Sequence, residues 1–195
     1  MRAAVAFRRA RPPASGLDEL VNATRAIVSR RAGWGETARL VADELRRHPP
    51  SPEVLPLDER DGDPDGHRSH PLYIAPDGAF SIVALVWRPG QVTPIHDHVT
   101  WCVFGVLQGV EDEERFSLDE EHACLVPAGT NLNETGEVSG FAPPGDIHRV
   151  RNVGDVTAIS IHVYGTDVSR IGSSVRRYYE LPVRRETTSS TDGSS

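Results

Sequence analysis

Apolar residues in the first part of the chain recur with the period of an amphipathic helix. Within residues 16–28 they share one face of a 3.6-residue repeat, and they are Leu17, Leu20, Val21, Ile27 and Val28. Ser15 is a suitable N-cap for this helix, and Gly33 is a suitable stop. A second helix is expected at about 36–47, ending before two prolines. Proline and aspartate crowd residues 49–66, which predicts a connecting loop.

From residue 71 onward the pattern changes to short blocks rich in β-branched and aromatic residues, separated by clusters of Gly, Pro and Asp. The blocks are 72–74, 80–87, 101–107, 123–126, 138–141, 148–152 and 157–164. Short strands with turn signals between them are typical of an antiparallel β-sandwich or barrel. A later stretch, 175–181, fits either a helix or a strand. We therefore expect a mainly β fold preceded by a small helical segment.

Length and charge narrow the class of protein. A chain of 195 residues suits one ordinary domain, and the net charge of −7 disfavours nucleic acid as a partner. All 21 basic residues are arginine, which excludes Schiff-base chemistry on lysine. The apolar runs fall short of the roughly 18–20 residues that a membrane span needs, and residues 1–14 lack the apolar core of a secretory signal. We expect a cytoplasmic protein with no membrane partner.

Two histidines one residue apart carry the first chemical signal. On a strand, His96 and His98 would project to the same side, because residues i and i+2 share a face. Two such imidazoles can bind one metal ion at about 2.0–2.2 Å. Two surface histidines on an edge strand would produce the same pattern, so this pair alone leaves both interpretations open.

A second segment adds the context. Residues 143–152 read PPGDIHRVRN, in which a turn is followed by His148 and then by Asn152. Together with residues 90–109, GQVTPIHDHVTWCVFGVLQG, this segment resembles the paired motifs of the cupin superfamily. Every fixed position of the two motifs is met except a glutamate of the first, whose place is taken by Cys102.

This resemblance implies a fold and a ligand set. The fold is the cupin double-stranded β-helix, an antiparallel β-barrel at about 70–165, within a single domain of residues 16–183 that includes the N-terminal helices. The composition of residues 1–15 and 184–195 predicts disordered tails. The implied metal ligands are His96, His98 and His148.

The missing glutamate points to one branch of the superfamily. Cupins with Cys or Gly at this position include the thiol dioxygenases, and the chain is similar to the cysteine dioxygenase family. Residues 87–101, WRPGQVTPIHDHVTW, also resemble the bacterial 3-mercaptopropionate dioxygenases. By ligand chemistry alone three imidazoles could hold Zn, Ni or Cu, so Fe(II) is what the resemblance implies.

An alternating run, Ser160-Ile-His162-Val-Tyr164, supports the same branch. Alternation alone predicts a half-buried strand whose polar face meets solvent. Thiol dioxygenases carry S-x-H-x-Y near the metal as a chain of hydrogen bonds, which implies that Ser160, His162 and Tyr164 belong to the catalytic site. Cys102 stands where some cysteine dioxygenases form a thioether to this tyrosine, although a small buried apolar role is the alternative.

The resemblance also implies the reaction. Both atoms of O2 would be added to the sulfur of a small thiol carboxylic acid, either cysteine or 3-mercaptopropionate, to give a sulfinic acid. Arginine is the natural partner of the carboxylate because its planar group binds both oxygens. The family positions for this partner lie near Arg68 and His70 upstream, or at Arg176 and Arg177 downstream of the tyrosine.

Two other functions remain open at this point. A cupin isomerase or hydrolase would use Zn or Mn on the same fold, and a small-molecule sensor would bind a ligand or metal without turnover. The missing glutamate and the S-x-H-x-Y run argue against both. The oligomeric state is not determined by any pattern in the sequence.

Overall fold

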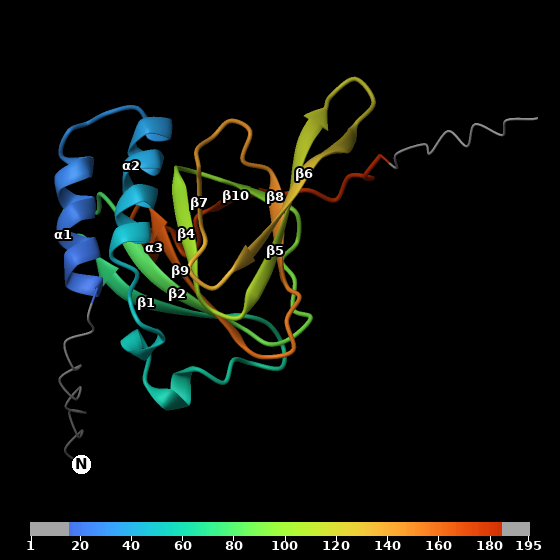
Figure 1. The fold of residues 1–195 in the computed structure, drawn as a ribbon. Helices are drawn as coiled ribbons and strands as arrows, with labels where there is room; N and C mark the ends of the chain where they lie inside the picture. Colours follow the sequence, from blue (N-terminus) through green and yellow to red (C-terminus); the bar gives the residue numbers. More distant parts are fainter. Residues whose placement is uncertain (1–15, 185–195) are drawn as a thin grey trace, which may run out of the picture.

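The computed structural model describes residues 16–184 (Figure 1). The predicted disordered tails, 1–15 and 184–195, lie outside the described residues except for Arg184. The elements in chain order are α1 (Leu17–Val28), α2 (Trp34–Arg47), the 3-10 helices η1 (Pro52–Val54) and η2 (Leu57–Glu59), β1 (Arg68–Ile74), β2 (Ser81–Trp87), β3 (His96–His98), β4 (Cys102–Gln108), β5 (Val110–Asp119), β6 (Cys124–Glu134), β7 (Val138–Phe141), β8 (His148–Asn152), β9 (Ala158–Tyr164), α3 (Val168–Ile171) and β10 (Val175–Tyr178).

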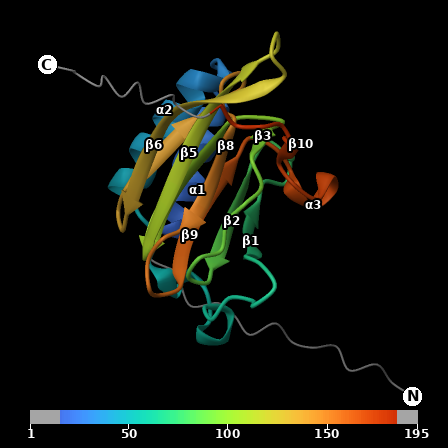
Figure 2. The ribbon, with the colours of Figure 1, turned by 90° about the vertical axis from the view of Figure 1, so that its right-hand side faces the viewer.

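The strands form two five-stranded sheets that face one another. The first has the order β1-β2-β9-β4-β7 and the second the order β10-β3-β8-β5-β6, and strands paired within each sheet run antiparallel. In Figure 2 the second sheet faces the viewer, and α1 and α2 lie behind the first. The expected mainly β fold with N-terminal helices is confirmed.

The two long helices cover the outer face of the first sheet (Figure 1). Leu20 of α1 and Leu45 of α2 are fully buried in one cluster with Ile82, Ala84 and Val86 of β2. The intervening β2 side chains belong to a second cluster on the inner face, and they are Val83, Leu85 and Trp87. Because β2 is buried on both faces, it reads as a continuous apolar run rather than an alternating one.

The element boundaries differ from expectation where local signals were weak. The N-cap of α1 is Gly16, while the expected cap, Ser15, lies outside the described residues. Strand β5 was not expected, because its acidic sequence lacks an apolar repeat. Residues 175–178 form a strand that pairs with β3, so the barrel extends past residue 165.

Over residues 16–184, every helix is too short or too polar to cross a membrane.

Candidate functional site

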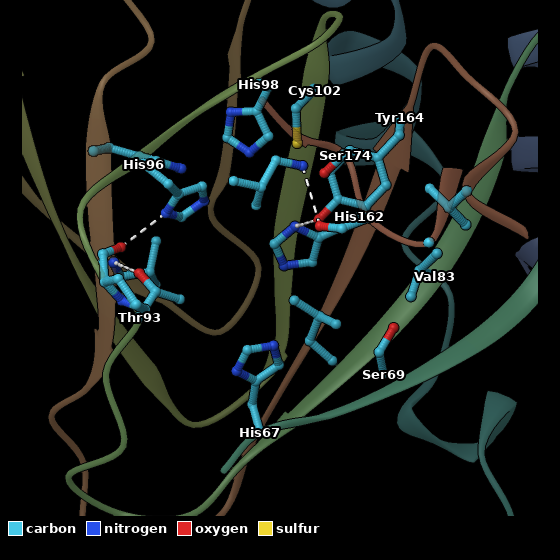
Figure 3. Close-up of a pocket in the computed structure, with 18 of the residues that line it drawn as sticks. His67, Ser69, Val83, Thr93, His96, His98, Cys102, His162, Tyr164 and Ser174 are labelled. Carbon is cyan, nitrogen blue, oxygen red and sulfur yellow. Dashed lines mark hydrogen bonds between the residues drawn. The ribbon is translucent and has the colours of Figure 1, made fainter. Parts of the chain in front are cut away.

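Three histidines meet on the inner face of the second sheet. His96 and His98 lie on β3, and His148 on β8 is paired with His96 across the two strands. One ring nitrogen from each residue lies within 4.8 Å of the others, and all three side chains are buried. Figure 3 shows His96 and His98 pointing into the same cavity. The structure therefore brings together the three ligands that the motifs imply.

Each of these imidazoles is held by a hydrogen bond at Nδ1. The partner of His96 is the carbonyl of Pro94 at 2.9 Å. His98 bonds to Asp146 at 3.2 Å, and His148 bonds to Glu113 at 2.7 Å. A ring that donates from Nδ1 has its lone pair on Nε2, so these contacts select the tautomer in which Nε2 is free to bind a metal ion.

Asp146 binds both the side chain and the backbone of His98. Its Oδ2 atom also accepts a hydrogen bond from the backbone N–H of His98 at 2.8 Å. Burial would raise the pKa of Asp146, but the hydrogen bonds from His98 outweigh it and the pKa stays below its usual value. The carboxylate is therefore ionised at neutral pH and can accept both hydrogen bonds.

Two of the three candidate ligands, His96 and His98, are neutral before an ion binds. Burial, reinforced by the neighbouring imidazoles, lowers the pKa of His96 to about 3. The pKa of His98 is also lowered, chiefly by burial. Neutral imidazoles present lone pairs at physiological pH, so a metal ion would not have to displace protons from these two ligands.

Cys102 occupies the position of the absent glutamate. It lies on β4 directly opposite Tyr164 of β9, and its side chain is buried. Burial raises the pKa of the Cys102 thiol well above its usual value, and the negative charges of Glu113 and Asp146 add to this effect. An uncharged thiol therefore stands where the motif that the chain resembles has a glutamate.

The polar face of β9 meets the barrel interior and not solvent. Ser160 Oγ lies 3.0 Å from His162 Nε2, and His162 Nδ1 lies 3.2 Å from the Tyr164 hydroxyl. The indole N–H of Trp87 donates to Ser160 Oγ at 3.1 Å. Burial lowers the pKa of His162 well below its usual value and raises that of Tyr164 well above it. The three side chains form a hydrogen-bonded chain of neutral groups.

The three candidate ligands, His162 and Tyr164 open into one cavity of about 280 Å³ between the sheets (Figure 3). His162, Tyr164 and Cys102 line it together with the three candidate ligands. Apolar walls come from β2 and β8, through Val83, Leu85, Trp87 and Val150. The segment after β9 supplies small hydroxyl side chains, which are Ser169, Ser173 and Ser174. This size and lining suit a small molecule with an apolar body and few polar groups.

The expected upstream substrate-binding residues do not line the cavity, which corrects the sequence interpretation. Arg68 pairs with Asp63 at 2.9 Å, and His70 lies 3.1 Å from Glu59. Strand alternation explains their positions, because Ser69 between them points into the cavity.

The downstream arginines are also outside the cavity lining. Arg176 pairs with Asp97, and the Arg177 guanidinium lies 4.1 Å from the centre of the Tyr179 ring. A register shift between Val175 and Arg177 sets this arrangement. No arginine is among the lining side chains of the described chain.

Several site residues escaped the sequence analysis. Asp146 stood within the quoted second motif, two residues before His148, and could have been noticed there. Glu113 lay in an acidic stretch that gave no strand signal. His67 also lines the cavity, where its ring lies 4.5 Å from that of Trp87, but a single loop histidine carries no pattern.

Comparison with known proteins places the chain in a family. Among solved structures, an oxalate oxidase in complex with glycolate, a substrate analogue, is 17% identical, covers 58% of this chain and 65% of its own, and has a TM-score of 0.43. The Cnp3 cupin domain of Schizosaccharomyces pombe is 17% identical, covers 54% and 71%, and has a TM-score of 0.40. Likenesses this low support no functional argument.

The sequence comparisons are more specific. Cysteine dioxygenase type 1 of Danio rerio is 28% identical over 92 residues, which are 45% of this chain and 46% of the relative. The chain thus spans about half the length of this curated relative. The model of the family described as Cysteine dioxygenase type I matches residues 65–177, which hold the three histidines, Cys102 and the β9 chain. With more than half of its length matched, the protein belongs to the cysteine dioxygenase type I family.

Proposed function

We propose that the protein is a non-haem iron thiol dioxygenase that converts a small thiol and O2 into a sulfinic acid. Both oxygen atoms are transferred to sulfur, so the reaction RSH + O2 → RSO2H needs no further reductant. The observation that carries this proposal is the site itself. Three imidazoles without a carboxylate ligand lie in one cavity with His162 and Tyr164.

The donor set fits Fe(II). His96, His98 and His148 would hold the ion through Nε2, because their Nδ1 atoms are engaged by Pro94 and by two carboxylates. When bound, Fe(II) supplies the redox chemistry that joins O2 to the thiol sulfur. Imidazole also suits Zn, Cu and Ni, so the preference for iron rests on the family.

The charge balance of the site favours binding of the thiol in its deprotonated form. Neutral ligands leave the full positive charge of a divalent ion in the cavity, and this charge lowers the effective pKa of a thiol bound to it. A glutamate at position 102 would oppose the thiolate, whereas the protonated Cys102 does not. The protein's part is to offer ligands without negative charge and to line the cavity with apolar walls.

Tyr164 and His162 both line the cavity, and Tyr164 stands opposite Cys102. Its hydroxyl, oriented by His162 and Ser160, would donate a hydrogen bond to the reacting atoms. A thioether between Cys102 and Tyr164 stays a prediction, supported by their direct pairing across β4 and β9. Intact-mass measurement after turnover tests it, and an unmodified mass would exclude the bond.

The substrate we propose is a small thiol carboxylic acid, cysteine or 3-mercaptopropionate. A cavity of about 280 Å³ has room for molecules of this size. Since the arginines lie elsewhere, the hydroxyl groups of Ser69, Ser173 and Ser174 are candidate donors for the carboxylate, whereas Ser169 already donates to Asp167.

The decisive experiment measures O2 uptake by the Fe(II)-loaded protein with a panel of thiols, and identifies products by mass spectrometry. Cysteine, 3-mercaptopropionate and a longer thiol form the panel. His148→Ala is expected to abolish sulfinate formation, whereas His122→Ala, on an exposed turn, serves as the matched control that keeps it. Absence of sulfinate from every thiol would overturn the proposal.

A further inference from the structure

A further buried carboxyl group lies behind the site and has no role in the arrangement described so far. Glu111 of β5 is 0% exposed, and neither of its carboxyl oxygens has a well-formed hydrogen bond among the described residues. Burying such a group is costly unless it is neutral or hydrogen-bonded. Its neighbour on the same face of the strand, Glu113, is already engaged by His148.

The groups around Glu111 come from several strands. Across the barrel, the Ser160 hydroxyl of β9 lowers the pKa of the Glu111 carboxyl, although the structure forms no hydrogen bond between the two side chains. In its own sheet, Asn152 of β8 and Asn133 of β6 are its cross-strand partners, and both are uncharged. Burial raises the pKa of Glu111 to about 7, and the Glu113 charge adds to this rise while Ser160 opposes it. Protonated Glu111 is therefore accessible near neutral pH.

The hydrogen-bonding capacity of Ser160 makes the protonation of Glu111 consequential. A serine hydroxyl donates one hydrogen bond and accepts two. One acceptor position of Ser160 is filled by the Trp87 indole N–H. If a protonated Glu111 donates to the second, the serine can only donate, and its remaining partner is His162 Nε2.

The direction of this hydrogen bond fixes the direction of the next one along β9. When His162 accepts at Nε2, its proton is on Nδ1, which donates to the Tyr164 oxygen. The hydroxyl hydrogen of Tyr164 is left free to point into the cavity. With Glu111 ionised, Ser160 would donate to the carboxylate and accept from His162 Nε2. The Tyr164 hydroxyl would then donate its hydrogen to His162 Nδ1 instead of pointing into the cavity.

We propose that Glu111 is a positioning residue whose carboxyl group donates a hydrogen bond to Ser160 and thereby turns the Tyr164 hydroxyl toward the substrate. This inference rests on the proposed thiol dioxygenase function for its kinetic consequences. The presence of a neutral Glu111 carboxyl group beside Ser160, at one end of the row of hydrogen bonds on β9, does not depend on turnover.

Two variants separate a directing role from a merely structural one. Glu111→Gln keeps a donor toward Ser160 that cannot ionise, whereas Glu111→Leu keeps the bulk and removes the donor. We expect Glu111→Leu to lower kcat about tenfold with KM little changed, and Glu111→Gln to restore most of that loss. Wild-type kcat should fall as pH rises through about 7, and this fall should be absent in Glu111→Gln. Glu120→Gln, on the exposed turn after β5, is the control.

A second measurement is independent of activity. Infrared difference spectra of the metal-free protein at pH 6 should show a protonated carboxyl band that Glu111→Gln removes and Glu120→Gln retains. Absence of this band, or equal kcat in Glu111→Leu and wild type, would overturn the role of Glu111. If the wild type oxidises no thiol, the dioxygenase proposal fails, while the infrared band still decides whether Glu111 is the neutral donor. Should Glu111→Leu fail to fold, the band and the pH profile of Glu111→Gln still decide.

Discussion

Replacement of Glu111 by glutamine changes one buried group and should change stability in a way that depends on pH. The pKa of Glu111 is raised by burial from 4.5 to about 7, so the folded protein holds this proton more tightly than the unfolded chain does. The stability that the proton contributes is complete below pH 4.5 and is lost as pH rises through 7. Glutamine cannot ionise, so its contribution does not vary with pH.

The magnitude follows from the shift. A difference of roughly 2.5 pKa units, at 1.36 kcal/mol per unit, corresponds to about 3 kcal/mol. Between pH 4.5 and 8.5 the variant should therefore gain about 3 kcal/mol of unfolding free energy relative to wild type. For a domain of this size, such a gain raises the melting temperature by roughly 6–12 °C.

Urea unfolding of the metal-free proteins, followed by tryptophan fluorescence at both pH values, measures this difference. Histidines and other carboxylates titrate in both proteins, so their contributions to the pH dependence of the unfolding free energy cancel when variant and wild type are compared. Glu120→Gln, which removes an exposed carboxylate, should show no comparable change. If Glu111→Gln differs from wild type by the same amount at pH 4.5 and 8.5, Glu111 does not ionise in this range and the reasoning is refuted.

Three further substitutions test the metal centre. His148→Ala should lose both bound iron, measured as metal content, and sulfinate formation, and full iron loading would refute the ligand assignment. Glu113→Gln weakens the partner that holds His148 Nδ1, so iron affinity should fall about 10–100-fold in a chelator competition; an unchanged affinity would contradict this role. Tyr164→Phe should keep its iron and lose about 100-fold in kcat, and unchanged turnover would remove the hydroxyl from the reaction.

Local spacing was sufficient for the parts of the site that lie on one strand. His96 and His98 share a face because they are two residues apart, and the same rule aligns Ser160, His162 and Tyr164 on β9. The two N-terminal helices were equally predictable from their 3.6-residue repeat. In each case the information was confined to a few consecutive residues.

The contacts that complete the site link residues far apart in the chain. Glu113 reaches His148 across 35 positions, and Asp146 reaches His98 across 48. Glu111 meets Ser160 only because the two sheets face one another. A stretch of acidic residues gives no sign of such partners, because a surface strand would show the same composition.

The arginines are residues that the sequence suggested for the site but that the structure places elsewhere. Family positions suggested Arg68 and Arg176, but the side of the strand on which each lies depends on its pairing register, and here both bind acidic partners outside the cavity. The sequence by itself thus determined the fold class through its short-range periodicity, and the three candidate ligands and the β9 residues through the resemblance of its motifs to a known family. The tertiary structure alone decided which carboxylates hold the ligands, which residues line the cavity and that Glu111 stands behind Ser160, because these depend on sheet register and on the packing of one sheet against the other.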